Sequence, residues 1–261
     1  GWIDPNNIEE RVTITQSRTE GHVTYPATPL TVTKAERPNI LFIAVDAWRS
    51  DAFDQVTTPY AFQLTQAPNA LYFRQHFSGG NVTKGGVFSL FYAIPPTYWD
   101  ALTAAQRPPV LFSTLQSLGY TTGIYGSGPL INPSFHRNVF SSIENLQTMT
   151  KGSTPAQRDK QMVKDFQAFL DQKQEQPFVG FLFFDAAHGY APPEDYQPRF
   201  EPYWERVDHV DLGPEFDPLP YKNRYRTALH FVDSQIKRVI EDLKRRQLYD
   251  NTIIVLTSDH G

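Results

Sequence analysis

Short apolar runs alternate along this chain with longer stretches in which apolar residues recur every three or four positions. The clearest run covers residues 39–45 and ends on the carboxylate of Asp46. Unbroken apolar runs of this length are typical of parallel strands that are buried on both faces of a sheet. The same pattern predicts further strands at 121–125, 178–184 and 252–257, and a weaker one at 71–76.

Helical periodicity fills the segments between these runs. It is strongest over 221–248, where Tyr225, Val232 and Ile236 belong to an apolar face and charged residues occupy the opposite face. Strands that alternate with helices predict an α/β fold, in which a mostly parallel central sheet is sandwiched by helices. The other predicted helices cover 58–65, 82–93, 109–118 and 155–174.

Residues 1–37 differ from the rest of the chain, because they show no sustained helical period and contain Pro26 and Pro29. This pattern is typical of an extended arm or linker. We therefore predict two parts, an arm over 1–37 and one α/β domain over 38–261.

Composition narrows the function classes that such a domain could serve. The chain has 24 basic and 28 acidic residues and a formal net charge of −4, so no overall basic field attracts nucleic acid. The absence of cysteine excludes disulfides, thiolate metal sites, a cysteine nucleophile and a formylglycine made from cysteine. No apolar run approaches the roughly 20 residues that span a bilayer.

Polar residues follow several of the predicted strands directly. Asp46 follows the strand predicted at 39–45, and Asp185 and then His188 follow the one at 178–184. The sequence Ser-Asp-His-Gly over 258–261 follows the strand at 252–257. Parallel strands present their carboxyl ends at one edge of the sheet, so these side chains are expected to lie close together. Asp46, Asp259 and His260 would form an oxygen-rich ligand set for a divalent cation such as Mg²⁺, Mn²⁺ or Zn²⁺.

A glycine-rich stretch over 76–86 offers a fourth ligand. Thr83 lies where a helix is predicted to begin, and the positive end of a helix stabilises both an alkoxide and an incoming phosphate or sulfate. Lys84 adds a cation beside it. No glycine precedes this lysine, so the stretch does not match the nucleotide-binding Walker pattern.

Each of these signals also has an ordinary structural interpretation. A lone Asp at the end of a strand is more often a turn former than a ligand, and residues 258–261 would make an ordinary polar turn. His188 is equally compatible with an exposed loop histidine. The coincidence of three such signals at one predicted edge favours a metal site.

At these residues the chain resembles the sulfatase-like branch of the alkaline phosphatase superfamily. Residues 38–51 look like that family's opening strand, and residues 258–261 look like its later metal motif. The resemblance implies metal ligands at Asp46, Asp259 and His260. It also implies that Thr83 is both ligand and nucleophile, and that further sheet and helices follow residue 261, which leaves the domain incomplete at its C-terminus.

The nucleophile region departs from the true sulfatases of that superfamily. No C/S-x-P-x-R motif for formylglycine surrounds Thr83, so desulfation is disfavoured. A threonine at this place resembles the lipoteichoic acid synthases and phosphoethanolamine transferases, which act on lipid head groups. His188 resembles a family histidine near the substrate, with Lys84 as a further substrate-binding candidate. The family's usual His-x-Pro is, however, replaced here by the sequence His-Gly-Tyr-Ala-Pro over 188–192.

The sequence also resembles the periplasmic domain of a bacterial inner-membrane protein of this branch. That resemblance implies a place at the periplasmic face of the inner membrane, attachment through segments absent from this chain, and a role in cardiolipin and lipopolysaccharide homeostasis. The expected partners are phospholipid or lipid A head groups and an inner-membrane protein, and no nucleic acid.

Three functions therefore compete. The first is a lipid-responsive binding or regulatory module, and the alternative is a metal-dependent phosphatase or phosphoryl-group transferase that uses Thr83. A carbohydrate-binding surface is a weaker third, suggested by aromatic residues in proline-rich loops, namely Tyr98, Trp99, Tyr196, Tyr203 and Trp204.

Overall fold

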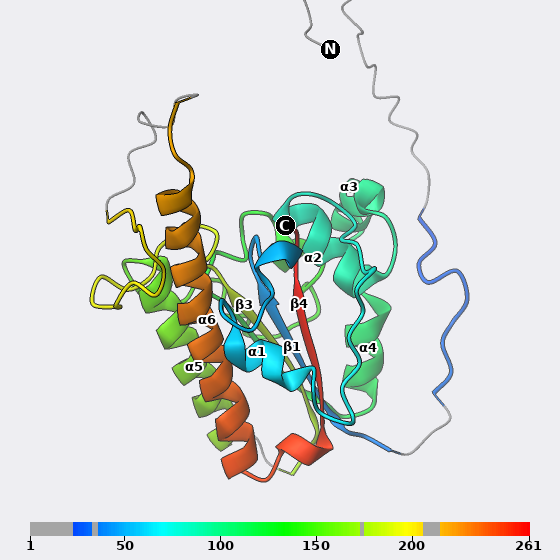
Figure 1. The fold of residues 1–261 in the computed structure, drawn as a ribbon. Helices are drawn as coiled ribbons and strands as arrows, with labels where there is room; N and C mark the ends of the chain where they lie inside the picture. Colours follow the sequence, from blue (N-terminus) through cyan, green and yellow to red (C-terminus); the bar gives the residue numbers. More distant parts are fainter. Residues whose placement is uncertain (1–22, 33–35, 173–174, 206–214) are drawn as a thin grey trace, which may run out of the picture.

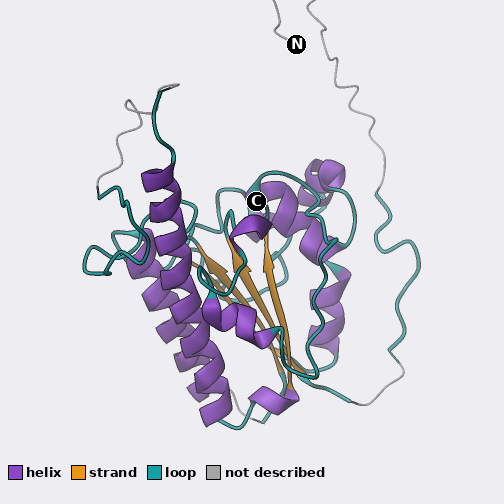
Figure 2. Ribbon diagram, in the orientation of Figure 1, coloured by secondary structure: helices purple, strands orange, loops and turns teal. Residues whose placement is uncertain are grey.

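Four parallel strands form a single sheet with helices on both sides (Figures 1 and 2). The computed structural model describes residues 23–32, 36–172, 175–205 and 215–261. The strand order is β2-β3-β1-β4, and each neighbouring pair is parallel. The strands are β1 (Asn39–Val45), β2 (Thr121–Gly126), β3 (Phe178–Phe184) and β4 (Thr252–Ser258). The predicted α/β class is confirmed.

Six α-helices cover the sheet in the described part of the chain. They are α1 (Pro59–Leu64), α2 (Thr83–Tyr92), α3 (Trp99–Ala104), α4 (Val110–Ser117), α5 (Pro155–Gln172) and α6 (Leu219–Arg245). Short 3₁₀ turns lie at Ser50–Ala52, Pro96–Tyr98, Phe135–Arg137 and Tyr249–Asn251. Five of the six helices were predicted. The sequence did not predict α3 (Trp99–Ala104), because this helix closely follows the prolines at 95 and 96, a pattern that indicates a proline-rich loop.

The weak strand predicted at 71–76 is wrong. These residues form a loop, and the side chains of Leu71 and Phe73 are 82% and 73% exposed. Apolar and aromatic residues alone do not make a strand, which needs a neighbouring strand to satisfy its backbone groups.

Side chains of β1 alternate between two hydrophobic cores. Leu41, Ile43 and Val45 pack with α1, α5 and α6 on one face of the sheet. Ala44 lies with α2, α3 and α4 on the other face. Figure 1 shows these two helix layers on opposite sides of the strands. This alternation is the two-residue period of a strand whose two faces are both covered.

The register of the sheet brings three strand ends level. Val45, the last residue of β1, lies opposite Phe184 of β3 and Ser258 of β4. The backbone N–H of Asp46 continues the ladder by donating to the carbonyl of Phe184 at 2.9 Å. The residue after each of these strands is an aspartate, so Asp46, Asp185 and Asp259 meet at one edge.

Only part of the predicted arm can be compared with the structure, since residues 1–22 and 33–35 lie outside the described residues. Residues 23–32 contain neither helix nor strand. Tyr25 packs against Tyr92 of α2, and its hydroxyl donates to the carbonyl of Tyr92 at 3.0 Å. The described part of this segment is therefore anchored on the domain.

The helices of the described residues are too short or too polar to cross a bilayer. The long helix α6 illustrates this, because its buried face carries Tyr225, Val232 and Ile236 while its exposed face is charged. Its apolar side is used against the sheet and α5.

Candidate metal centre

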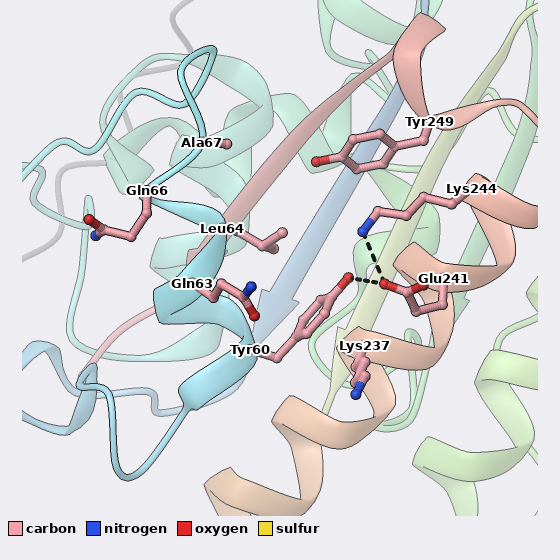
Figure 3. Close-up of a pocket in the computed structure, with 9 residues that line it drawn as sticks. All are labelled: Tyr60, Gln63, Leu64, Gln66, Ala67, Lys237, Glu241, Lys244 and Tyr249. Atoms are coloured by element: carbon pink, nitrogen blue, oxygen red, sulfur yellow. Dashed lines mark hydrogen bonds and ion pairs between the residues drawn. The ribbon is translucent and has the colours of Figure 1, made fainter.

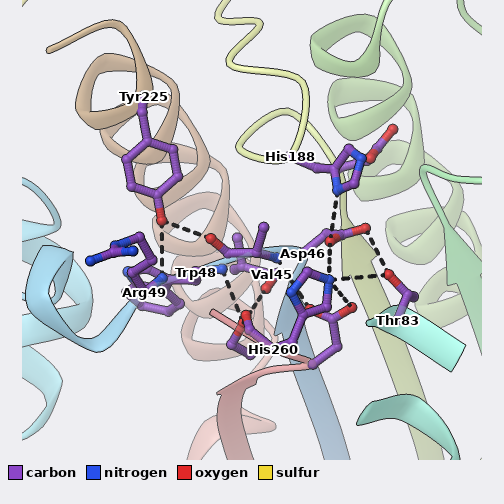
Figure 4. A network of polar contacts seen from close by, with 12 residues as sticks. Val45, Asp46, Trp48, Arg49, Thr83, His188, Tyr225 and His260 are labelled. Carbon is purple, nitrogen blue, oxygen red and sulfur yellow. Dashed lines mark hydrogen bonds and ion pairs between the residues drawn. The ribbon is translucent and has the colours of Figure 1, made fainter. Parts of the chain in front are cut away.

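Asp46 occupies the middle of a polar cluster at the carboxyl edge of the sheet (Figure 4). Its Oδ1 lies 3.1 Å from Nδ1 of His188 and 3.4 Å from Nε2 of His260. Its Oδ2 lies 3.4 Å from the hydroxyl of Thr83. The Asp46 side chain is only 8% exposed, so the loss of its hydration has to be offset by these neighbours.

Asp259 is the second carboxylate of the cluster, and one of its oxygens makes no hydrogen bond to the described residues. Its Oδ1 accepts the backbone N–H groups of Ala47 and His260, at 3.2 and 2.8 Å. Its Oδ2 is buried and has no hydrogen-bond partner among the described residues. Burial is the largest cause that raises the pKa of the Asp259 carboxyl group, and the nearby charge of Asp46 is the second largest. A buried, unpartnered carboxylate oxygen is what a cation would satisfy.

The side chains fit a single divalent cation. One ligand atom each from Asp46, His188 and His260 lies within 4.8 Å of the other two, so the structure adds His188, which the sequence placed near the substrate, to the residues that could hold a cation. Nε2 of His260 is also 3.5 Å from the Oδ2 of Asp259, which makes no hydrogen bond to the described residues. Carboxylate oxygens with imidazole nitrogens suit Mn²⁺, Zn²⁺ or Mg²⁺, in keeping with the ligand types that each ion accepts.

Thr83 is the first residue of α2, and its hydroxyl faces this cluster. The hydroxyl lies 3.5 Å from Nε2 of His260, in addition to its contact with Asp46. The preceding residue, Val82, has an extended backbone and supplies no side-chain cap. The positive end of α2 is therefore not neutralised by a capping side chain, as an anion site requires.

Close packing of α2 against the end of β4 fixes the position of Thr83. A Cβ placed on Gly86 would lie 1.9 Å from the carbonyl oxygen of Asp259, so only glycine permits this approach. The hydroxyl of Ser78 donates to the same carbonyl.

Lys84 is placed differently from the other candidates. Its ammonium lies over the ring of Trp99, 4.8 Å from the ring centroid, and the residue is exposed. This is a cation–π contact with α3. Substrate binding by Lys84 stays a prediction.

His188 lies on the loop that follows β3. Its side chain is 57% exposed, and its hydrogen bond with Asp46 raises the pKa of the imidazole to about 9. The start of α5 holds this loop in place. The fully buried carboxylate of Asp159 accepts the backbone N–H groups of Asp185 and Ala186, at 3.0 and 3.1 Å. Arg158 pairs with Asp185 at 3.0 Å.

Comparison with known proteins shows which family the chain belongs to. The sulfatase family model matches residues 38–261. The chain belongs to the sulfatase family. Within that family it is 26% identical over 226 residues to the inner membrane protein YejM of Salmonella typhi, a match that covers 85% of this chain and 33% of that protein. The chain thus spans about a third of the length of this relative.

Solved structures of sulfatase-like fold agree with the computed one. The phosphonate monoester hydrolase of Agrobacterium radiobacter matches with a TM-score of 0.61 and 16% identity, over 86% of this chain and 63% of the hydrolase. The C-terminal periplasmic domain of EcEptC from Escherichia coli matches with a TM-score of 0.60 and 17% identity, over 87% of this chain and 64% of that domain. At these identities the likeness establishes the fold alone.

Sequence reasoning missed residues of this sulfatase-family domain that support the cluster without belonging to it. Tyr225 was assigned only to the apolar face of α6, yet its hydroxyl contacts the loop after Asp46. The hydroxyl of Ser258 accepts the backbone N–H of Trp48 at 3.0 Å. The sequence did contain one signal for Tyr225. A tyrosine in place of a phenylalanine on a buried helix face needs a hydrogen-bond partner for its hydroxyl.

A recess elsewhere in the sulfatase-family domain is lined by nine residues (Figure 3). It has a volume of about 570 Å³ and lies between α1, α6 and the turn before β4. Within it the carboxylate of Glu241 accepts from the hydroxyl of Tyr60 at 2.8 Å and from Lys244 at 3.0 Å. These groups satisfy one another, and none belongs to the metal cluster.

Most aromatic residues of the carbohydrate hypothesis pack against the domain. Trp99 is buried, the hydroxyl of Tyr196 lies 2.6 Å from Nδ1 of His230, and Trp204 packs against Phe216. Only Tyr98 of this set is strongly exposed. These five residues therefore do not form a row of exposed rings for a sugar to stack on.

Proposed function

We propose that the cluster around Asp46 is a divalent-metal centre for phosphoester chemistry on lipid head groups, with Thr83 as the nucleophile. The observation that carries this proposal is the position of the Thr83 hydroxyl. It lies 3.4 Å from Asp46 and 3.5 Å from His260, at a helix end that has no capping side chain. A hydroxyl between candidate metal ligands and a positive helix end is placed for nucleophilic attack.

The residues divide into two roles. Asp46, Asp259, His260 and Thr83 would hold the cation, which when bound favours the deprotonated form of the threonine hydroxyl and stabilises charge on the phosphoryl group. The buried Oδ2 of Asp259, which makes no hydrogen bond to the described residues, supports this assignment. Lys84 and His188 are the candidates for contact with the substrate.

The proposed reaction has two halves. In the first, Oγ1 of Thr83 forms a bond to phosphorus, the bond from phosphorus to the leaving oxygen breaks, and that oxygen takes a proton from His188. In the second, water or an acceptor hydroxyl attacks the phospho-threonine, Thr83 leaves, and the proton of the attacking group returns to His188. Water makes the domain a hydrolase and an acceptor hydroxyl makes it a transferase. His188 is suited to this role because its imidazole is exposed and lies beside Asp46.

The substrate class follows from the chemistry of the nucleophile. The chain has neither cysteine nor a C/S-x-P-x-R motif near Thr83, so a formylglycine sulfatase is disfavoured. The YejM relatives are named as inner membrane proteins, and the EcEptC structure is named as a periplasmic domain. These names support lipid head groups as substrates, and a place for this domain at the periplasmic face of the inner membrane.

A second candidate is a lipid-responsive regulatory module that contributes to cardiolipin and lipopolysaccharide homeostasis. The similarity to YejM over most of the chain favours it, as does the replacement of the family's His-x-Pro beyond His188. In this role the domain would contact lipid head groups or an inner-membrane protein without turning over a phosphoester.

The two candidates are separated by activity measurements on Thr83 variants. Thr83→Ala should abolish the Mn²⁺-dependent hydrolysis of an aryl phosphate, while Thr83→Ser should keep part of it. Thr114→Ala is the matched control, because Thr114 is a partly buried threonine on α4 outside the cluster. Equal rates for the parent and Thr83→Ala would refute the nucleophile. Parent protein that binds Mn²⁺ without turnover would favour the regulatory module.

A further inference from the structure

The loop that follows Asp46 is held by a hydroxyl group from a distant part of the chain. The phenol oxygen of Tyr225, on α6, accepts the backbone N–H of Arg49 at 3.0 Å. The same hydroxyl donates to the carbonyl of Ala47 at 2.7 Å. Figure 4 shows Tyr225 reaching this loop from the side opposite His188 and Thr83.

This loop in turn orients the second carboxylate of the centre. The N–H of Ala47 donates to Oδ1 of Asp259 at 3.2 Å, and the N–H of Trp48 donates to the hydroxyl of Ser258. Ala47 has a φ of 58°, in the left-handed region that alanine rarely adopts. A backbone in this conformation needs restraint from outside, and the hydroxyl of Tyr225 supplies two hydrogen bonds that provide it.

We propose that Tyr225 is a positioning residue of the metal centre. Its hydroxyl fixes residues 47–49, and through the N–H of Ala47 it directs the free Oδ2 of Asp259 towards His260. The inference rests on the proposed metal centre and adds to it a residue that contacts neither the cation nor the substrate. Groups that orient metal ligands from behind commonly change metal affinity by about 10- to 100-fold when they are removed.

A substitution can remove the hydroxyl of Tyr225 and still keep the packing of its ring. The ring is buried and packs against Tyr190, 5.1 Å between centroids, so phenylalanine would keep this contact. Burial also raises the pKa of the hydroxyl to about 12, so it stays protonated and able to donate. Tyr225→Phe therefore removes the two hydrogen bonds to the loop and leaves the packing in place.

The chain offers a matched control in Tyr196→Phe. The hydroxyl of Tyr196 makes a hydrogen bond to the same helix, at 2.6 Å from Nδ1 of His230, and it touches no residue of the metal cluster. Each substitution removes one phenol oxygen that bonds to or from α6. Tyr225 is buried and Tyr196 is half-buried. A general loss of stability therefore affects both variants, whereas loss of positioning affects only Tyr225→Phe.

The test compares the parent and both variants by two measurements. In metal-free protein, amide hydrogen exchange at Ala47 and Arg49 should be faster in Tyr225→Phe alone, because the loop opens more readily. In the same variant the ¹³C shift of the Asp259 carboxyl group should also move. In a calorimetric titration with Mn²⁺, Tyr225→Phe should bind about tenfold more weakly than the parent, and Tyr196→Phe should match the parent.

Other outcomes contradict one proposal at a time. Unchanged exchange at Ala47 together with unchanged Mn²⁺ affinity in Tyr225→Phe overturns the positioning role, and so does equal weakening in both variants. Parent protein that binds no Mn²⁺ contradicts the proposed metal centre instead. In that case the exchange at Ala47 and the Asp259 shift still decide whether Tyr225 orders the loop.

Discussion

Gly86 and Asp259 are in direct backbone contact, although 173 positions separate them in the sequence. A Cβ on Gly86 would come within 1.9 Å of the carbonyl oxygen of Asp259. This contact joins the helix that carries Thr83 to the strand end that carries the candidate ligands Asp259 and His260. The spacing between the proposed nucleophile and the proposed ligands thus depends on a glycine that takes no part in the proposed chemistry.

Gly86→Ala should therefore disrupt the proposed metal centre, although Gly86 is not one of its ligands. The added methyl group must push α2 away from β4, and overpacking of this kind typically costs about 1–3 kcal/mol in the free energy of unfolding. Mn²⁺ affinity should fall as well, because Thr83 moves with the helix. Denaturant unfolding and Mn²⁺ titration measure the two effects. Gly128→Ala is the control, since a Cβ there meets no atom within 4 Å. Full Mn²⁺ affinity in Gly86→Ala would argue against Thr83 as a ligand.

The carboxyl edge of the sheet could be predicted from the sequence because strand and ligand signals coincide there. Buried parallel strands give unbroken apolar runs, and the aspartates that end them are visible as soon as the runs are aligned. The fold class and the meeting of Asp46, Asp259 and His260 followed from these two facts.

Other features depend on contacts that leave no local pattern. The side chains of residues 71–76 satisfy strand propensity, but no neighbouring strand pairs with them in the described residues. Lys84 is adjacent to Thr83 in sequence, yet its ammonium lies on Trp99. The partners of Tyr225 and Gly86 are more than 170 positions away from each, so only the folded structure reveals them.

Asp46→Asn should weaken metal binding strongly while sparing the fold. Asp46 lies nearest to both histidines, and loss of a carboxylate ligand should lower Mn²⁺ affinity by at least about 100-fold. Stability without metal should fall only modestly, because the lost ion pair with the half-exposed His188 is partly offset by relief of the repulsion that helps to raise the pKa of Asp259. Calorimetry and thermal unfolding test these expectations, with the exposed Asp51→Asn as control. A strongly destabilised metal-free variant would mean that Asp46 is mainly structural.

His188→Gln should separate metal binding from catalysis. If His188 acts on the leaving group, Mn²⁺ affinity should stay within about threefold of the parent, while turnover should fall by about 10²- to 10⁴-fold. The same titration and an aryl phosphate assay give both values. A drop in affinity as large as that of Asp46→Asn would instead make His188 a metal ligand.

Asp159 predicts a pH dependence of stability that is independent of the metal. Burial raises the pKa of this carboxyl to about 7 in the folded protein, from the ordinary value of 3.8. Between these two values the folded state holds a proton that the unfolded state has lost, so this group makes the unfolding free energy fall as pH rises.

Asp159→Asn isolates that contribution. The unfolding free energy of the parent, relative to the variant, should decrease between about pH 4 and pH 7 and then level off. Chemical denaturation at a series of pH values measures the difference. The opposite result is an unfolding free energy of the parent, relative to the variant, that increases with pH. It would show that the carboxylate of Asp159 is ionised in the folded protein and is stabilised by the N–H groups of Asp185 and Ala186.

The most direct measurement of the central claim is anomalous X-ray scattering from crystals of the full chain grown with Mn²⁺. The account predicts one strong peak among Asp46, Thr83, Asp259 and His260, bonded to the Oδ2 of Asp259 that is buried without a partner, and its loss in Asp46→Asn. Crystals of the parent that show no peak at this position, with the side chains arranged as described, would contradict the metal centre and the phosphoester chemistry proposed for it.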